Sequence, residues 1–444
     1  MLLNPLTTST KYRSGIPMLP GAFPVVGHLP AFFTSAAELI ADGRRRFGTL
    51  FWLNMGPGLG WHLTCCGSEG FELLKTKSLS NAHLAETHPQ FISERGVMAL
   101  EGTAHQRLRG LMTSAFSPKG LAENSAAQIS IEVMNELVSD WASKGRTTIL
   151  ADTQRAALGV IFQMLDVPRQ QMSDWHKQYR RFSWSAIPIP VLDRLVVKPA
   201  TQWLFIRLRE LAEQARRSTR SRSVLSTLAH SENEAGEKLS IDELADNMRL
   251  LAFAGHDTTA AAMAWAVIEL ARQPGLWDRL VAEVQENPHI PKAPSELRGH
   301  PLAEAIFRET IRLHPSVPLY SRRTLRAFMF AGHEIPQDEI IFIPPCDFSS
   351  DPEIFSQPER FDADRWLGRS SPPTGMEVAA FGGGNHFCLG YHLALLEGVQ
   401  LLTTLALKLS GRGLRPKLPP GAVPRTHNLP LTHPAASTVV LFSA

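Results

Sequence analysis

The stretch Phe381-Gly382-Gly383-Gly384-Asn385-His386-Phe387-Cys388-Leu389-Gly390 decides how the rest of the chain is interpreted. It places Cys388 after a triple-glycine loop and before an apolar helix expected at about residues 389–409. The N–H groups of a tight glycine-rich loop and the positive end of a helix both stabilise a thiolate. Such a sulfur suits three roles: a nucleophile, a redox thiol, or the axial ligand of a haem iron.

Bulk composition narrows the classes of protein. The chain has 444 residues, of which 44% are hydrophobic and 20% charged, as expected for a globular protein with an ample core. The formal net charge is +3, from 45 Lys and Arg against 42 Asp and Glu. This value is too small to indicate nucleic-acid binding. The four cysteines, Cys65, Cys66, Cys346 and Cys388, form no disulfide framework, so we expect a reducing compartment.

Sequence features of membrane targeting are absent. The start, Met1-Leu2-Leu3-Asn4-Pro5, has no apolar run long enough for a signal peptide or anchor. No later stretch of about 18 apolar residues is free of charges. We therefore expect a cytoplasmic protein without a membrane anchor, too short to include its own flavin or iron–sulfur module.

The order of the segments predicts a mainly α fold with smaller β regions (α+β). A Pro/Gly-rich lead and a helix at about 34–47 precede two strands, Thr49–Asn54 and Trp61–Cys65, joined by the turn Gly56-Pro57-Gly58-Leu59-Gly60. That turn lacks the G-x-G-x-x-G spacing of a dinucleotide site. We expect one domain over 1–444. Its parts are a lead (1–30), a β-rich part (31–67), a helical part (68–315), and β segments with the Cys loop and its helix (316–444).

The longest predicted helix begins at a capping box, Ser240 with Glu243, and runs to about Arg272, a length close to 48 Å. Its middle reads Ala254-Gly255-His256-Asp257-Thr258-Thr259-Ala260, which is unusually polar for a buried helix. One interpretation is close helix packing at Gly255, with Thr hydroxyls bonded back to carbonyls one turn earlier. The other is a local opening of the helix beside a ligand, where Asp257 and Thr258 handle protons.

A second helix carries Glu309 and Arg312, which lie on one face at i, i+3 and can pair. Such a pair is common by chance. Arg360, in Pro358-Glu359-Arg360-Phe361, offers another arginine, and we expect a buried carboxylate shared by the two guanidiniums.

A third segment places His105 and Arg109 on one helical face at i, i+4, suited to holding a pair of carboxylates. A solvated basic face is the alternative.

These four pieces, in this order, resemble the cytochrome P450 family of thiolate-haem monooxygenases. The pattern F-x-x-G-x-[RH]-x-C-x-G is met by Phe381, Gly384, His386, Cys388 and Gly390, and [AG]-G-x-[DE]-T by Ala254, Gly255, Asp257 and Thr258. The E-x-x-R pair is Glu309 and Arg312, followed by the Pro-Glu-Arg-Phe element. The resemblance covers nearly the whole chain. The Cys motif is highly specific, and the others gain weight from their order.

The resemblance implies haem b (iron protoporphyrin IX), held between the long central helix and the Cys-loop helix, with Cys388 as proximal ligand. Phe381 would pack near the sulfur, and Gly384 and Gly390 would let the backbone approach it. The residues implied as propionate contacts are His105, Arg109, His386 and Arg322, the arginine ten residues after Arg312. Many members have Arg at position 386, so His386 makes that contact titratable and favours a bacterial-type enzyme.

On the other side of the haem, Asp257 and Thr258 resemble the family's acid–alcohol pair, which delivers protons for O–O cleavage. Gly255 would leave room for O2, and His256 is expected to face away. Glu309, Arg312 and Arg360 would be structural.

The resemblance also implies an apolar, mid-sized substrate such as a terpenoid, steroid, fatty acid or polyketide. The expected pocket carries few charges. Its predicted lining is Phe91, Ile92, Ile187, Ile189, Val191, Leu251, Val317, Leu319 and Leu429. Electrons would come from a ferredoxin or flavodoxin with its reductase, with Arg107 and Lys119 as candidate contacts. We expect a monomer.

Other functions remain as alternatives. A peroxide-dependent or isomerising thiolate-haem enzyme tends to lose the acid–alcohol pair, which is intact here. A non-catalytic haem sensor has no use for a proton relay. A cysteine hydrolase or thiol oxidoreductase is disfavoured because no second cysteine stands in C-x-x-C spacing and His386 is poorly placed as a base.

Overall fold

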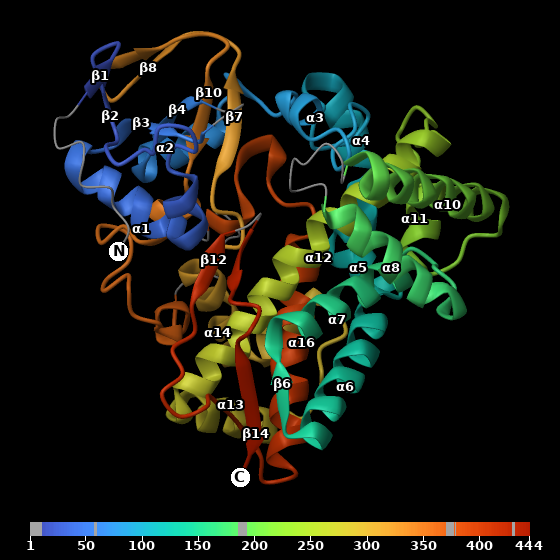
Figure 1. Cartoon of the computed structure of the whole chain (residues 1–444). Coiled ribbons are helices and arrows are strands. Elements are labelled where there is room, and N and C mark those ends of the chain that lie inside the picture. Colours follow the sequence, from blue (N-terminus) through green and yellow to red (C-terminus); the bar gives the residue numbers. More distant parts are fainter. Residues whose placement is uncertain (1–10, 57–59, 185–192, 370–376, 378, 429–430) are drawn as a thin grey trace. The chain divides into compact units, whose positions relative to one another are not determined.

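The structure is a computed structural model that describes residues 11–56, 60–184, 193–369, 377, 379–428 and 431–444. The chain divides into two compact units, which are described separately. The first comprises Met1–His83, Arg308–Cys388 and Pro424–Ala435; the second comprises Leu84–Phe307, Leu389–Val423 and Ala436–Ala444. The mainly helical structure with smaller sheets confirms the expected α+β class (Figure 1). The single domain remains a prediction.

A seven-stranded sheet in the order β1-β2-β3-β4-β10-β7-β5 organises the first unit. The strands are β1 Lys11–Arg13, β2 Ile16–Met18, β3 Leu50–Asn54, β4 Trp61–Cys65, β10 Ile340–Ile343, β7 Tyr320–Thr324 and β5 Leu79–Ser80. β3 and β4 pair antiparallel, from Leu50 opposite Cys65 to Asn54 opposite Trp61. This pairing confirms the predicted hairpin, although turn residues 57–59 lie outside the described residues.

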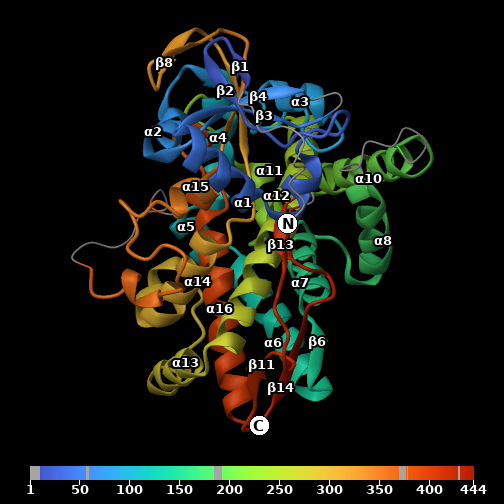
Figure 2. The ribbon, with the colours of Figure 1, turned by 60° about the vertical axis from the view of Figure 1, so that its left-hand side comes forward.

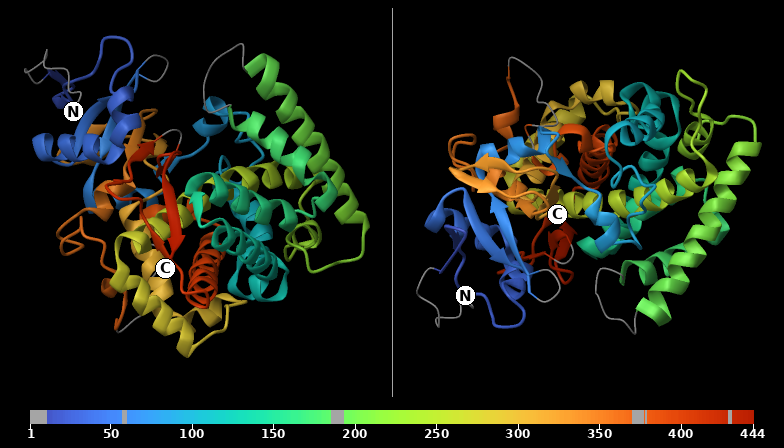
Figure 3. Two further views of the ribbon diagram at one scale, coloured as in Figure 1. Left: turned by 60° about the horizontal axis from the view of Figure 1, so that its bottom comes forward. Right: turned by 90° about the horizontal axis from the view of Figure 1, so that it is seen from above.

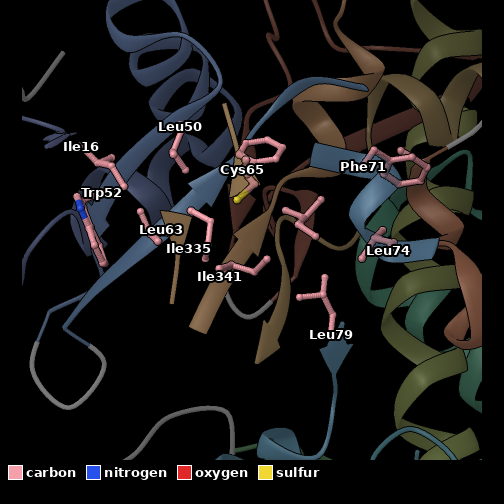
Figure 4. Close-up of a cluster of buried hydrophobic side chains, with 13 residues drawn as sticks. Ile16, Leu50, Trp52, Leu63, Cys65, Phe71, Leu74, Leu79, Ile335 and Ile341 are labelled. Atoms are coloured by element: carbon pink, nitrogen blue, oxygen red, sulfur yellow. The ribbon is translucent and has the colours of Figure 1, made fainter. Parts of the chain in front are cut away.

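Both faces of β3 are buried, which explains its unbroken apolar run. Leu50 and Trp52 join a cluster with Leu63 and Ile341 (Figure 4). Phe51 and Leu53 point the other way, into a second cluster that includes side chains of α1, Leu29–Phe47. Alternation along a strand sends successive side chains to opposite faces, so a strand covered on both sides needs apolar residues throughout.

Short elements complete the first unit. They are α2 Gly67–Glu72, η1 Leu73–Lys75, β8 Phe328–Phe330, β9 His333–Ile335, α15 Pro345–Ser349, η6 Ala363–Trp366, η8 Ala379–Phe381, η9 Gly384–His386, β12 Thr426–Asn428 and β13 Thr432–Pro434. The pairs β8–β9 and β12–β13 are antiparallel.

The second unit is built around α12, Ile241–Arg272, against which α7, α10, α13 and α16 pack (Figures 1 and 2). Its other helices are α3 His83–Thr87, α4 Gly102–Phe116, α5 Pro118–Glu123, α6 Ala126–Lys144, α7 Ile149–Met164, η2 Arg169–Gln171, α8 Met172–Ser183, η4 Asp193–Val197, α10 Lys198–Arg217, α11 Val224–His230, α13 Pro274–Glu286, η5 Pro294–Gly299 and α16 Tyr391–Ser410. A three-stranded sheet orders β11 Arg415–Lys417, β14 Val439–Ser443 and β6 Arg146–Thr148. Helix α14, Pro301–Leu313, ends in the first unit.

The predicted start of α12 is confirmed. The Ser240 hydroxyl accepts from the N–H of Glu243 at 3.1 Å, and the Glu243 carboxylate accepts from the N–H of Ser240 at 2.8 Å. This capping box satisfies two backbone donors that the first turn leaves without helical partners.

The buried Glu309 carboxylate forms the expected clamp, but with a different second arginine. Glu309 and Arg312 are both fully buried, with N–O distances of 2.8 and 2.9 Å. Arg365 donates to Glu309 at 2.9 Å, and the Trp366 indole donates at 2.8 Å. The prediction of Arg360 was wrong. Its guanidinium is exposed beside Gln357, and only its backbone carbonyl reaches the clamp, accepting from Arg312 at 3.2 Å.

Replacing Glu309 by Ala should lower the free energy of unfolding by about 3–5 kcal/mol, because it leaves a buried guanidinium without its carboxylate. Arg360→Ala is the matched control and should change stability by less than about 0.5 kcal/mol, since it removes an exposed side chain. Urea unfolding followed by circular dichroism measures both. If both variants lost the same amount of unfolding free energy, Arg360 would matter as much as Glu309, and the assignment of Arg365 as the second arginine would be contradicted.

Candidate active site

The Cys388 loop is closed by its own backbone. The N–H of Cys388 donates to the carbonyl of Phe381 at 2.9 Å, and the N–H of Phe387 donates to the carbonyl of Gly384 at 3.1 Å. Gly384 has φ +63°, and a Cβ there would lie 2.2 Å from the carbonyl oxygen of Leu74. Only glycine fits this position, because both the backbone conformation and the space exclude a side chain.

Cys388 differs from the other three cysteines in its accessibility. Its side chain is half-exposed, whereas Cys65, Cys66 and Cys346 are buried. Burial raises the pKa of the Cys65 and Cys66 thiols, and it raises the pKa of Cys346 to about 12. A thiolate ligand must be reachable and deprotonated, so Cys388 is the cysteine suited to bind a metal.

Tyr320 holds the segment that leads into the Cys loop, a role that sequence reasoning missed. Its hydroxyl donates to the carbonyl of Ala379 at 2.8 Å. Burial raises the pKa of this phenol; Arg322 lowers it, and Cys388 raises it, so both groups lie within electrostatic reach of Tyr320. Nothing in the sequence around Tyr320 marks this role.

The first unit brings together five of the predicted site residues. Arg322 is buried on β7, and its guanidinium donates to the Ser321 carbonyl at 2.9 Å. His386 ends η9 and is half-buried. Phe381, Gly384 and Cys388 belong to the same loop.

The middle of α12 is the accessible part of an otherwise buried helix. Residues 244–250 and 259–270 are all buried. Between them a half-exposed face is formed by Leu251, Ala254, Gly255 and Thr258. Their i, i+3, i+4, i+7 spacing places them on one side of the helix, which we call the open face of α12.

α12 is continuous across its polar middle, so the local opening considered from the sequence is not present among the described residues. The Thr258 hydroxyl donates to the Ala254 carbonyl at 2.6 Å. A Cβ on Gly255 would lie 3.1 Å from a methyl of Ile161 on α7. Both contacts agree with the interpretation in which α12 packs closely at Gly255 and its threonine hydroxyls bond back to carbonyls one turn earlier.

Asp257 lies in a polar network of three helices of the second unit. Its Oδ1 accepts from the Gln154 amide of α7 at 2.9 Å, and His256 Nδ1 lies 3.2 Å from the same oxygen. His256 is buried, with its ring edge-on to Tyr179 of α8 at 5.1 Å. Burial, and secondly the charge of Asp257, raise the pKa of Tyr179, whose hydroxyl donates to the Ala252 carbonyl. Gln154 was not identified from the sequence, because nothing in α7 marks it.

His105 and Arg109 lie on α4, one turn apart, with His105 buried and Arg109 half-buried. Arg107 on the same helix ion-pairs with Glu243 at the start of α12, and Lys119 on α5 is 84% exposed. Lys119, whose ammonium lies 3.8 Å from the Glu123 carboxylate, is therefore the more exposed of the two candidate partner contacts. Gly390 precedes the first turn of α16.

The helix after the Cys loop, α16, combines an apolar surface with one buried carboxyl. Among the described residues it is the one helix long and apolar enough to span a membrane, yet 78% of that apolar window is buried inside the protein. Glu397 is 5% exposed, and burial raises its pKa to about 8. Its carboxyl is therefore neutral in the folded protein at neutral pH.

Glu397 makes stability depend on pH. The folded protein keeps its proton up to about pH 8, whereas the unfolded chain loses it above its ordinary pKa of 4.5. The contribution of Glu397 to the free energy of unfolding is therefore complete below pH 4.5, and it is lost as the pH rises towards 8. Glu397→Gln should remove that loss, so its stability relative to wild type should rise by about 1.4 kcal/mol per pH unit in this window. Urea unfolding at pH 5, 7 and 9 measures the free energy of unfolding of both proteins. The same pH dependence in wild type and Glu397→Gln would refute the prediction.

The expected pocket lining is only partly described. Ile187, Ile189, Val191 and Leu429 lie outside the described residues. Ile92 lines a cavity of about 540 Å³ in the second unit. Glu94, Arg95, Asp246 and Arg249 also line this cavity, and of the predicted lining residues that the structure describes it includes Ile92 alone. The expectation of a substrate pocket with few charges remains a prediction. Asp246 and Arg249 were not singled out from the sequence.

Comparison with known proteins gives a consistent result. The sequence model of the family described as Cytochrome P450 matches residues 161–410. "Cytochrome P450 BJ-4" of Bradyrhizobium diazoefficiens is 37% identical over 447 aligned residues, which span 100% of both chains. "Cyclooctat-9-en-7-ol 5-monooxygenase" of Streptomyces melanosporofaciens is 26% identical, with 87% of each chain covered. The solved structure "Retinoic acid bound cyanobacterial CYP120A1" matches 95% of this chain and 97% of its own with a TM-score of 0.80 at 20% identity.

The chain therefore belongs to the cytochrome P450 family. It is an oxidoreductase, a haem-thiolate monooxygenase whose cofactor contains a haem iron.

Proposed function

We propose that Cys388 is the proximal ligand of haem b and that the enzyme uses O2 to hydroxylate or epoxidise an apolar, mid-sized substrate. The observation that carries the proposal is the accessibility of Cys388, the one cysteine of four that is not buried. The relatives are named as cytochromes P450 and, in one case, as a monooxygenase of cyclooctat-9-en-7-ol. That name, which denotes a largely hydrocarbon alcohol, supports an apolar substrate, and we propose a terpenoid, steroid, fatty acid or polyketide as its class.

The residues present fit a haem. A thiol that is accessible, in a loop whose Gly384 admits no side chain, has the donor chemistry for an iron ligand. The open face of α12 carries the small residues Ala254 and Gly255 beside Thr258, which leaves room for a flat group and a small gas. We assign the propionates to His105, Arg109, Arg322 and His386, with Phe381 and Gly390 beside the sulfur.

Haem iron with a thiolate ligand, when bound, supplies O2 activation and O–O cleavage. The chain supplies the protons. Thr258 Oγ1 now donates to Ala254, and rotation about its Cα–Cβ bond turns that proton toward the open face of α12. Asp257, held by Gln154, exchanges protons with solvent and replenishes the hydroxyl. Glu309, Arg312 and Arg365 keep their structural role.

The electrons come from a separate ferredoxin or flavodoxin with its own reductase, and exposed Lys119 suits contact with an acidic partner. We also propose that the enzyme acts as a cytoplasmic monomer and that the whole chain folds as one domain.

If Cys388 ligates the iron, the reduced, CO-bound protein should show the far red-shifted Soret band typical of thiolate ligation. Cys388→His should lose that band and give an imidazole-type spectrum, because nitrogen replaces the thiolate. Absorption spectra of the reduced CO complexes measure this.

The matched control is Cys346→Ser, which removes a buried thiol and should keep the red-shifted band. An imidazole-type spectrum in the wild-type protein would overturn the assignment of Cys388.

If Thr258 carries protons, Thr258→Ala should uncouple electron use from product formation and raise peroxide release several-fold, because protonation at the correct atom fails. The assay compares NADH consumed with peroxide formed, using a bacterial ferredoxin and its reductase. Thr259→Ala alters the neighbouring buried threonine and should stay coupled. Unchanged coupling in Thr258→Ala would remove Thr258 from the relay.

A further inference from the structure

The cavity of about 540 Å³ in the second unit combines an apolar wall with a buried cation. Its walls come from residues 85–95, from α10 and from α12, two helices that pack on each other (Figure 3). Ala85, Pro89, Ile92 and Phe205 supply the apolar surface. Arg249, from α12, lines the same cavity, and its side chain is only 9% exposed.

The guanidinium of Arg249 has unused donors. Within the described residues its one hydrogen bond runs from Nη2 to Asp246 Oδ1 at 3.4 Å, longer than a usual N–H···O bond. Its Nε is buried without any hydrogen-bond partner there. A guanidinium has five N–H donors, and a buried charged donor left unsatisfied is costly, so this arrangement points to a missing acceptor.

The carboxylate paired with Arg249 is also engaged by other donors. Asp246 is 3% exposed, and its Oδ2 accepts from Ser93 at 2.8 Å and from Arg95 at 3.0 Å. Arg95 is 52% exposed and has a second partner in Asp242 at 3.5 Å. Glu94 lies at the exposed rim, and no ion pair joins it to Arg249 among the described residues. A carboxylate placed against Arg249 would supply the acceptors that Asp246 does not.

We propose that this cavity binds the carboxylate head of an amphiphilic acid, with Arg249 as the donor. The inference goes beyond the proposed function, because it assigns a ligand class, a lipophilic acid, to a cavity whose lining includes no residue of the open face of α12.

The position of Arg249 along α12 fits this role. Phe253, one turn further on, is half-exposed and stacks on Phe91 at 4.2 Å, which extends the apolar surface from neighbouring Ile92. Thr258 is nine residues beyond Arg249, which at about 100° per residue places the two side chains on opposite sides of α12. The cavity beside Arg249 is therefore distinct from the open face of α12.

The test measures binding of decanoate and of 1-decanol to the haem-loaded protein by isothermal titration calorimetry. The two probes share a ten-carbon chain and differ in charge. Wild type should bind decanoate at least about tenfold more tightly than 1-decanol, because only decanoate forms a charge-assisted hydrogen bond with the buried guanidinium. The preference should persist at 0.5 M salt, because salt screens buried pairs weakly.

Arg249→Gln should weaken decanoate binding by about tenfold or more and change 1-decanol binding by less than about twofold. Arg209→Gln is the matched control. It removes one positive charge from the exposed face of α10, where Arg209 pairs with Glu213 and Asp242 outside the cavity lining, and it should leave both affinities unchanged. Should Arg249→Gln fail to fold, Arg249→Lys keeps the charge but loses the forked donors and should bind decanoate with intermediate affinity.

Several outcomes would overturn the proposal: no preference for decanoate in wild type, equal losses of both probes in Arg249→Gln, or the same loss in Arg209→Gln. The calorimetry needs neither electrons nor O2. It therefore gives its answer even if the CO spectrum refutes thiolate ligation, and the two failures are distinguishable.

Discussion

The buried carboxylate of Glu309 is the constraint on which the first unit depends. An ionised group with no solvent exposure is tolerated only where charged and polar donors surround it. Here Arg312, Arg365, Trp366 and the backbone N–H of Asp362 all donate to it. Burial raises the pKa of Glu309, but the hydrogen bonds and charge of Arg312 outweigh it, and the pKa is lowered. Three of these donors belong to residues 362–366, so one carboxylate secures the segment of chain that leads on to the Cys388 loop.

Buried carboxylates in the second unit also need donors around them, and there the donors leave a long helix unbroken. α12 is long and mostly buried, yet it carries Asp246 and Asp257, each satisfied by donors from other segments: Ser93 and Arg95 for the first, Gln154 for the second. Because these partners lie outside the helix, the backbone ladder stays intact. The polar middle therefore does not break α12. The result is a continuous helix with one open face, which holds Thr258 at a defined place along its axis.

Features that depend on neighbours in sequence were predictable, and those that depend on distant segments were not. The Ser240–Glu243 capping box, the β3–β4 hairpin and the Glu309–Arg312 pair all follow from local spacing, and all are present. The second arginine of the clamp was predicted wrongly because Arg360 and Arg365 are both near in sequence, and only the fold of the intervening turn decides which one faces Glu309. Tyr320 and Gln154 gave no local signal, since their roles come from contacts with Ala379 and Asp257.

Asp246 and Arg249 show most clearly how burial changes the meaning of a sequence pattern. On an exposed helix, an acid and a base at i, i+3 form a solvated pair worth a few tenths of a kcal/mol. On α12 both are buried, Arg95 donates to the same carboxylate, and the hydrogen bonding of Arg249 stays incomplete on a cavity wall. A cavity for purely apolar molecules gains nothing from such a guanidinium, because burying donors without acceptors costs stability. Its presence beside an apolar wall is instead the arrangement that separates an amphiphilic acid from a hydrocarbon of the same length.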